Sequence, residues 1–234
     1  MKKILLISIL LSTPKIVGQS THMFSKNPII NLENFDKQRV YFGFFLGFNN
    51  YGFKIDYKQI PTKNIVVDET TGFNVGLVAD LKLQEYVNLR FEPGLYYTQR
   101  DLRYSDFLRE VDALREVKST YIHLPLLLKF SSKRLGNIRP YLLGGVSTTL
   151  NLSSNSTAID DNLQQRFRVT RWTQNYELGF GMDFYLEYFK FSPSIRGVFG
   201  INDELVRDND PNSPWTSNIE SLKTRGILIN FTFH

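Results

Sequence analysis

The sequence predicts an all-β fold, an eight-stranded antiparallel up-and-down transmembrane β-barrel with short periplasmic turns and long extracellular loops. Three observations favour this fold. Apolar and polar residues alternate with period two in eight separate windows after residue 38, as in strands. Glycines gather on the polar face of these windows. The connections between the windows are alternately short and long, which is typical of barrels in the outer membrane.

The N-terminal residues 1–18 are expected to be a cleaved signal peptide. Two lysines precede the apolar run Ile4–Leu11, and Gly18 offers a small residue for cleavage near positions 18 and 19. The run is too short for a membrane helix, which needs roughly 20 residues. A buried or anchoring N-terminal helix is the alternative. Residues 19–38 are then a periplasmic pre-barrel segment, and residues 39–234 are the barrel domain.

Composition narrows the functional classes. The 234 residues contain no cysteine, which excludes disulfides and thiolate chemistry. Lys and Arg total 28 against 23 Asp and Glu, and three lysines lie in the expected leader, Lys2, Lys3 and Lys15. The remaining chain is nearly neutral, so we expect no nucleic-acid partner.

Each window places large apolar side chains on one face and polar, aromatic or glycine residues on the other. In the first window, Phe42 and Phe44 alternate with Tyr41, Gly43 and Phe45. Most windows have the length that a tilted strand needs to cross a bilayer, about 9–11 residues, and the third and seventh run somewhat longer. The windows are 40–49, 73–82, 87–98, 121–130, 141–150, 176–184, 189–202 and 226–234.

The glycines indicate which face points inward. Most of those in the windows lie on the polar face, whereas Gly144 and Gly197 lie on the apolar one. Glycine weakens an exposed strand and leaves nothing to pack. The lumen of an eight-stranded barrel is only just wide enough for side chains, so large inward residues need small neighbours. The polar face is therefore predicted to line the lumen. A soluble, lipocalin-like barrel with an apolar lumen is the alternative.

The connections set the orientation. Short turns are expected at 84–86, 132–137 and 185–188, and long loops at 50–72, 100–118, 152–171 and 203–223. Helical spacing of apolar residues in 106–117 predicts a short amphipathic helix that caps the barrel or docks a partner. Aromatic residues suited to the lipid interfaces are Tyr97, Trp172, Tyr176, Tyr185 and Tyr188.

Ten polar side chains are predicted to project into the lumen. We expect a neutralised salt-bridge network, because charges in a narrow low-dielectric space persist when they are paired. A polar conduit or ligand site centred on Arg90 and Glu92 is the alternative. The predicted lumen residues are Asp80, Lys82, Arg90, Glu92, His123, Lys129, Glu177, Asp183, Lys190 and Arg196.

No sequence pattern points to catalysis. The histidines are His22, His123 and His234, and none falls in a predicted extracellular loop. The zinc-protease, nucleophile-elbow, P-loop and EF-hand motifs are missing from the sequence. We expect a non-enzymatic protein with no catalytic residue, cofactor, metal ion or small-molecule substrate. Its expected partner is the lipid bilayer of the outer membrane.

Several segments resemble a known group. Residues 91–97, 121–130, 139–146 and 179–184 resemble the small outer-membrane β-barrel family of Bacteroidota. Within it, residues 31–44 look like the PorT family of type IX secretion and gliding motility. The resemblance implies an accessory protein needed for export of cargo proteins, with other secretion subunits as partners and no catalytic residues.

Residues 19–38 are also long enough to reach periplasmic partners. The candidate partner segment contains Ile29, Ile30, Leu32 and Phe35, and a disordered tether is the alternative. A second hypothesis is a stand-alone barrel that acts as an adhesin-like or envelope-stabilising protein through its extracellular loops.

Overall fold

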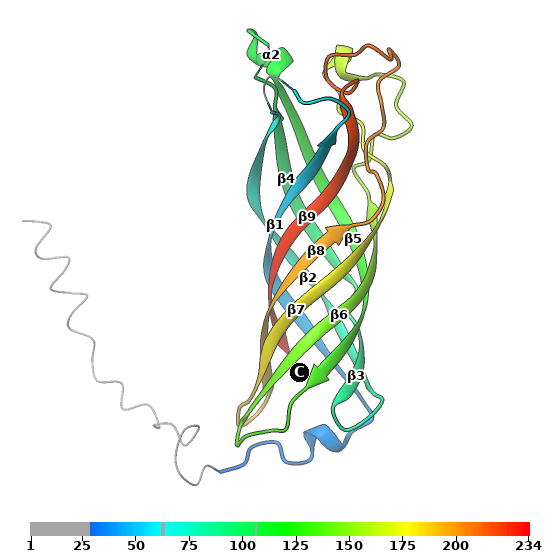
Figure 1. The fold of residues 1–234 in the computed structure, drawn as a ribbon. Coiled ribbons are helices and arrows are strands. Elements are labelled where there is room, and N and C mark those ends of the chain that lie inside the picture. Colours follow the sequence, from blue (N-terminus) through cyan, green and yellow to red (C-terminus); the bar gives the residue numbers. More distant parts are fainter. Residues whose placement is uncertain (1–28, 62–63, 106) are drawn as a thin grey trace, which may run out of the picture.

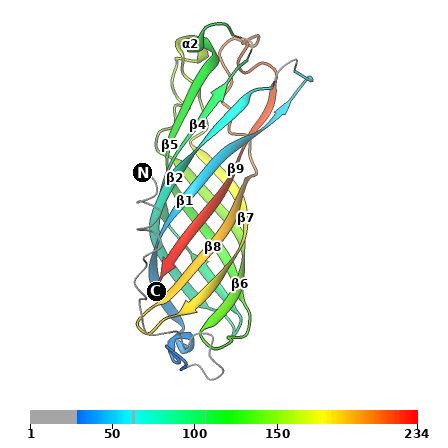
Figure 2. The same ribbon diagram turned by 90° about the vertical axis from the view of Figure 1, so that its left-hand side faces the viewer.

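A closed ring of antiparallel strands forms the molecule in the computed structural model, which describes residues 29–61, 64–105 and 107–234 (Figures 1 and 2). The strands follow one another around the ring, and β1 pairs with both β2 and β9 to close it. The strands are β1 (Val40–Tyr57), β2 (Val66–Lys82), β3 (Val87–Phe91), β4 (Gly94–Arg103), β5 (Leu114–Ser131), β6 (Ile138–Asn151), β7 (Trp172–Tyr185), β8 (Lys190–Gly200) and β9 (Ile219–Phe233). Within the described residues, three single-turn helices lie outside the ring: η2 (Phe35–Lys37), α2 (Glu110–Ala113) and η3 (Asn162–Gln164).

Segments β3 and β4 together make one of the eight strands of the ring. Both pair with β2 on one side and β5 on the other, and Glu92 and Pro93 separate them. Pro93 has no backbone N–H to donate, so one ladder hydrogen bond is missing at the interruption. The eight-stranded fold predicted from the windows is confirmed.

The apolar face of the strands points outward, as predicted. Large exposed side chains include Phe44, Leu77, Leu126, Phe180 and Ile229. Inward glycines make room for inward rings. A methyl group on Gly76 or Gly94 would lie 2.6 or 2.7 Å from the ring of Phe45, which is fully buried. The lumen is therefore too crowded for side chains at these positions.

The strands extend well beyond the predicted windows on the long-loop side, so the expected loops 50–72 and 100–118 were wrong. β1 continues to Tyr57 with β9 as its partner, and β4 and β5 pair out to Arg103 and Leu114. In these extensions the polarity reverses. Lys54 points outward, while Phe53 and Ile55 pack against an apolar cluster inside. Above the lipid the outer surface meets water, so the outward face becomes polar.

The extracellular end is closed by that apolar cluster. Its buried members come from the strand extensions and from the loops after β4, β6 and β8: Leu102, Tyr104, Val117, Phe167, Val169, Leu205, Trp215, Ile219 and Leu222. The predicted helix over 106–117 was wrong in length. Helix α2 has four residues, and Leu114 begins β5. Phe107 stacks on Trp215 with ring centroids 5.0 Å apart, so the segment does cap the extracellular end of the barrel.

Candidate functional site: the lumen and its two ends

A chain of buried ion pairs crosses the middle of the lumen. Arg90 on β3 holds Asp80 on β2 through two hydrogen bonds of 2.9 and 2.7 Å, and also donates to Glu92 at 3.1 Å. Arg196 on β8 donates to Glu92 at 2.7 Å and pairs with Glu177 on β7 at 2.8 Å. Because every carboxylate here has a cationic partner, the charges are neutralised where they lie.

His123 ends this chain on the β5 side. Its Nε2 lies 2.7 Å from Glu177 Oε1, and its Nδ1 lies 2.8 Å from the hydroxyl oxygen of Thr149. Both ring nitrogens therefore have partners, and the ring is buried. The ring thus joins Glu177 on β7 to Thr149 on β6 inside the closed lumen.

A second cluster lies nearer the periplasmic end. Lys129 donates to both oxygens of Asp183 at 2.8 and 2.7 Å, and Ser192 donates to the same carboxylate at 2.6 Å. Lys190 lies 4.0 Å from Asp183, and its ammonium lies 4.4 Å from the ring centre of Tyr41. The aromatic face stabilises this buried cation.

The structure therefore brings together nine of the ten predicted lumen residues. Lys82 is the exception, because it is only partly buried and donates to the backbone oxygen of Asp36 at 2.6 Å. His234 belongs here in its place, with Nε2 3.6 Å from Asp80 Oδ2. Four acids, Asp80, Glu92, Glu177 and Asp183, then face four bases, Arg90, Lys129, Lys190 and Arg196.

The pre-barrel segment is attached to the barrel. Residues 29–38, which we name the mouth segment, lie across the periplasmic end of the ring (Figure 1). Asn31 bonds to Asn137 and to the backbone of Tyr185 at 2.9 and 3.0 Å. The hydroxyl of Tyr185 donates to Asp36 at 2.7 Å. Tyr185 was expected at the lipid interface, which was wrong: it points inward and is fully buried.

Phe35 is the apolar anchor of the mouth segment. Its ring centre lies 5.0 Å from that of Tyr41 and 6.3 Å from that of His234, and the Lys190 ammonium lies 4.6 Å from it. Leu32 is partly buried, whereas Ile29 and Ile30 are 69% and 52% exposed. The four candidate partner residues thus divide into two that are partly buried, Leu32 and Phe35, and two that are exposed, Ile29 and Ile30. Residues 1–28, including the expected signal peptide, lie outside the described residues.

Loosening the mouth segment should expose it to protease. The double substitution Phe35→Ala and Asp36→Ala removes the ring contact and the Tyr185 hydrogen bond, so trypsin should cleave after Lys37 faster than in the wild type. Limited proteolysis of detergent-solubilised protein followed by mass spectrometry measures this. Glu33→Ala, at an exposed position of the same segment, is the control and should leave the rate unchanged. Equal cleavage in all three proteins would contradict the attachment.

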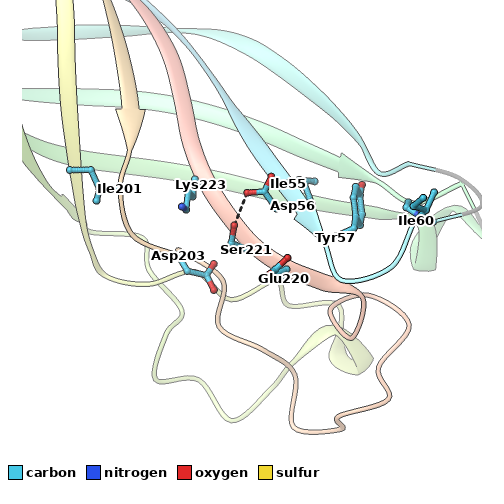
Figure 3. Close-up of a pocket in the computed structure, with 10 residues that line it drawn as sticks. Ile55, Asp56, Tyr57, Ile60, Ile201, Asp203, Glu220, Ser221 and Lys223 are labelled. Atoms are coloured by element: carbon cyan, nitrogen blue, oxygen red, sulfur yellow. Dashed lines mark hydrogen bonds between the residues drawn. The ribbon is translucent and has the colours of Figure 1, made fainter.

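The extracellular rim carries a groove of about 910 Å³ on its outer side (Figure 3). Asp56 on β1 accepts from Ser221 on β9 at 2.9 Å and pairs with Lys54 at 2.9 Å. The hydrogen bond from Lys54 lowers the pKa of Asp56. Asp203 accepts from the backbone N–H groups of Leu205 and Leu222 at 3.1 and 2.9 Å. These acids hold the rim together.

Two further charged residues inside the upper barrel escaped the sequence reasoning. Arg100 donates to Thr224 at 2.9 Å and to the hydroxyl of Tyr121, and its guanidinium lies 3.8 Å from the ring centre of Phe53. Glu204 accepts from the Thr224 backbone at 2.8 Å, and burial raises the pKa of its carboxyl. Both fall in expected loops. For Arg100, the alternation that continues past Thr98 to the end of β4 was the signal that could have found it.

The part of the chain that the structure describes contains no group of three or more His, Cys, Asp or Glu arranged to hold a metal ion. Nor do these residues include a helix long and apolar enough to cross a membrane. Fully buried side chains occupy the lumen from the Asp183 cluster to the cluster around Trp215. The paired charges of the lumen hold the ring together electrostatically.

A closed ring with an apolar outer wall and a polar lumen defines a transmembrane β-barrel. The profile of the outer membrane protein beta-barrel domain family matches residues 19–206. The chain belongs to this family, and its place is therefore the outer membrane.

Solved structures with a similar chain course are also outer-membrane barrels. OprG from Pseudomonas aeruginosa is 17% identical, with a TM-score of 0.43, over 82% of this chain and 92% of its own. Neisserial surface protein A is 7% identical, with a TM-score of 0.45, over 83% and 98%. AlkL, determined in lipid bilayers, is 13% identical, with a TM-score of 0.42, over 90% and 92%. No curated protein matches the chain significantly.

Proposed function

We propose that this barrel is a non-enzymatic component of the type IX protein secretion system, needed for export of cargo proteins and for gliding. The observation that carries the proposal is the mouth segment, which is held against the barrel by Phe35 and Asp36 while Ile29 and Ile30 remain exposed to the periplasm. The resemblance of residues 31–44 to the PorT family covers the same segment. The protein would act through this surface on other secretion subunits.

A filled lumen supports a role through surfaces. Four acids and four bases pair in the lower lumen, and the apolar cluster closes the upper end. Transport of a cargo protein or of a solute through this barrel would require displacing buried ion pairs, which costs several kcal/mol for each. Cargo would therefore pass through another subunit, which this barrel assists.

Secretion should fail when the exposed isoleucines become charged. A strain lacking the gene, complemented with the Ile29→Asp, Ile30→Asp variant, should retain cargo in the periplasm as the uncomplemented strain does, because a carboxylate opposes burial in an apolar contact. Immunoblots of the culture supernatant measure cargo, and co-purification measures partner binding. Leu135→Asp, at a periplasmic turn where Leu135 is 71% exposed, is the matched control and should restore secretion. Wild-type secretion by the isoleucine variant at normal barrel levels would contradict the proposal.

A second candidate is an adhesin-like or envelope-stabilising barrel that acts through its extracellular loops. It is favoured by nearly fully exposed aliphatic side chains at three loop tips, Ile60, Leu108 and Ile159. The loops that carry Ile159 and the residues after β8 are joined beneath the tips, where Asp208 accepts from Asn162 at 2.9 Å. Changing the three tip residues to Asp separates the candidates: secretion stays normal under the first and surface attachment is lost under the second.

A further inference from the structure

Three cations gather on the outer wall of β1 and β9, where the lipid-facing surface ends. Lys54 on β1 lies directly opposite Lys223 on β9, and Arg225 follows two residues along β9, opposite Gly52. All three lie on the outward face. Like charges placed directly across a strand pair destabilise it. An anion bound between them would remove that repulsion.

Of the three cations, Lys54 alone forms an ion pair with a carboxylate within the described residues. Asp56 pairs with Lys54 at 2.9 Å. Among the described residues, neither Lys223 nor Arg225 forms an ion pair. Asp203 and Glu220 line the adjoining groove together with Lys223 (Figure 3), but Asp203 already accepts from two backbone N–H groups and pairs with Arg207 at 3.4 Å. The Glu69 carboxylate lies against Gly52, but neither Glu69 nor Glu220 forms an ion pair within the described residues. Lys223 and Arg225 are therefore the two cations of the cluster that an anionic group can still pair with.

The cluster borders a hollow of about 310 Å³ whose other side is aromatic. Tyr176 and Phe199 stack there with ring centroids 5.0 Å apart, and Phe199 is the direct partner of Arg225 across β8 and β9. Strand β8 ends at Gly200, so no strand covers the flank of Lys223. The hollow thus has a cationic upper edge and an apolar lower one.

The position of the hollow relative to the bilayer indicates its occupant. Below Arg225 the outward residues of β9 are apolar, beginning with Ile227 and Ile229, and outward aromatic residues typically mark the lipid headgroup level. The long loops place this level in the outer leaflet. A ligand there has a negatively charged headgroup above and acyl chains against the aromatic pair below. Phosphate is the anion that lysine and arginine side chains bind well.

We propose that Lys54, Lys223 and Arg225 bind the phosphate of a glycolipid of the lipid A type in the outer leaflet. The acyl chains of the lipid lie along Tyr176 and Phe199. The site anchors a headgroup at one place on the barrel wall and fixes the face that the protein presents to neighbouring lipid. It is independent of the secretion proposal, which concerns the opposite end of the barrel.

Lipid binding by the purified full chain in detergent micelles tests the site. Native mass spectrometry would compare bisphosphorylated lipid A with its dephosphorylated form. Since each basic residue near an anionic lipid surface contributes roughly fivefold in affinity, Lys54→Gln, Lys223→Gln, Arg225→Gln should bind the phosphorylated lipid about a hundredfold more weakly. Lys54→Arg, Lys223→Arg should retain binding because charge is preserved.

The matched control neutralises three exposed cations on other strands and loops, Arg103, Lys118 and Arg166, each of which already pairs with a carboxylate. It should bind as the wild type does. Heat-dependent gel mobility reports whether each variant is folded; if the triple variant is not, Lys223→Gln alone should lose about fivefold. Unchanged binding by the neutralised protein, equal binding of dephosphorylated lipid, or full competition by millimolar inorganic phosphate would each overturn the proposal.

Discussion

Replacing Arg196 with methionine is expected to lower the free energy of unfolding by about 3–5 kcal/mol, because it leaves two buried carboxylates without their cation. Arg196 is buried and pairs with Glu92 at 2.7 Å and with Glu177 at 2.8 Å. Equilibrium urea unfolding in lipid vesicles, followed by tryptophan fluorescence, measures the loss. Adding Glu92→Gln and Glu177→Gln should recover much of it, since the uncompensated charges are then removed.

The control for Arg196 is an exposed arginine in a similar pair. Arg103 pairs with Asp68 at 3.2 Å, and both side chains are about half exposed. Arg103→Met should change the free energy of unfolding by about 0–1 kcal/mol, because water screens the pair. Similar losses of unfolding free energy in the two variants would show that the buried ion pairs of the lumen contribute no more to stability than an exposed pair does.

Phe45→Ala is expected to destabilise the barrel by about 3–5 kcal/mol. Phe45 is fully buried in the lumen against Gly76, Gly94 and Tyr96, so truncation leaves a cavity among rigid strands. Vesicle-based unfolding is again the measurement. The glycines cannot fill the space, and the surrounding ring cannot collapse without breaking strand pairs.

The neighbouring residue on the same strand provides the comparison. Phe44 points to the lipid and is 49% exposed. Phe44→Ala loses apolar contact with lipid and with Phe233, but acyl chains can fill the space, so the loss should be smaller, about 1–2 kcal/mol. A larger effect at Phe44 than at Phe45 would mean that the inward and outward faces had been assigned the wrong way round.

The barrel was predictable because alternation and glycine placement respond to the same physical boundary. Within the bilayer, outward side chains contact hydrocarbon and inward ones must fit a narrow ring, so period-two patterning is strong from Val40 to Phe48 and again from Ile227 to Phe233. The strand break at Pro93 was visible as a residue without a backbone donor, yet the window there was predicted as one continuous strand.

Outside the bilayer the strands carry the reverse contrast between their two faces. From Phe53 onwards the outward face is wet and the inward face apolar, which is the opposite contrast. Apolar outward faces therefore end at the membrane boundary, and the predicted strands ended there too. The helix predicted over 106–117 came from apolar spacing that is satisfied instead by strand β5 and by Phe107 stacked on Trp215.

By itself, the sequence determined the ring of strands, which face meets lipid, and the charged residues of the lower lumen except His234, because these follow from local periodicity. Arg100 and Glu204 of the upper barrel lie in segments that were predicted as loops. Only the tertiary structure decided the pairings: that Arg196 joins Glu92 to Glu177, that Lys82 lies outside the network, and that Phe35 anchors the mouth segment. Such contacts join distant strands, so they depend on register and ring closure, which no local pattern encodes.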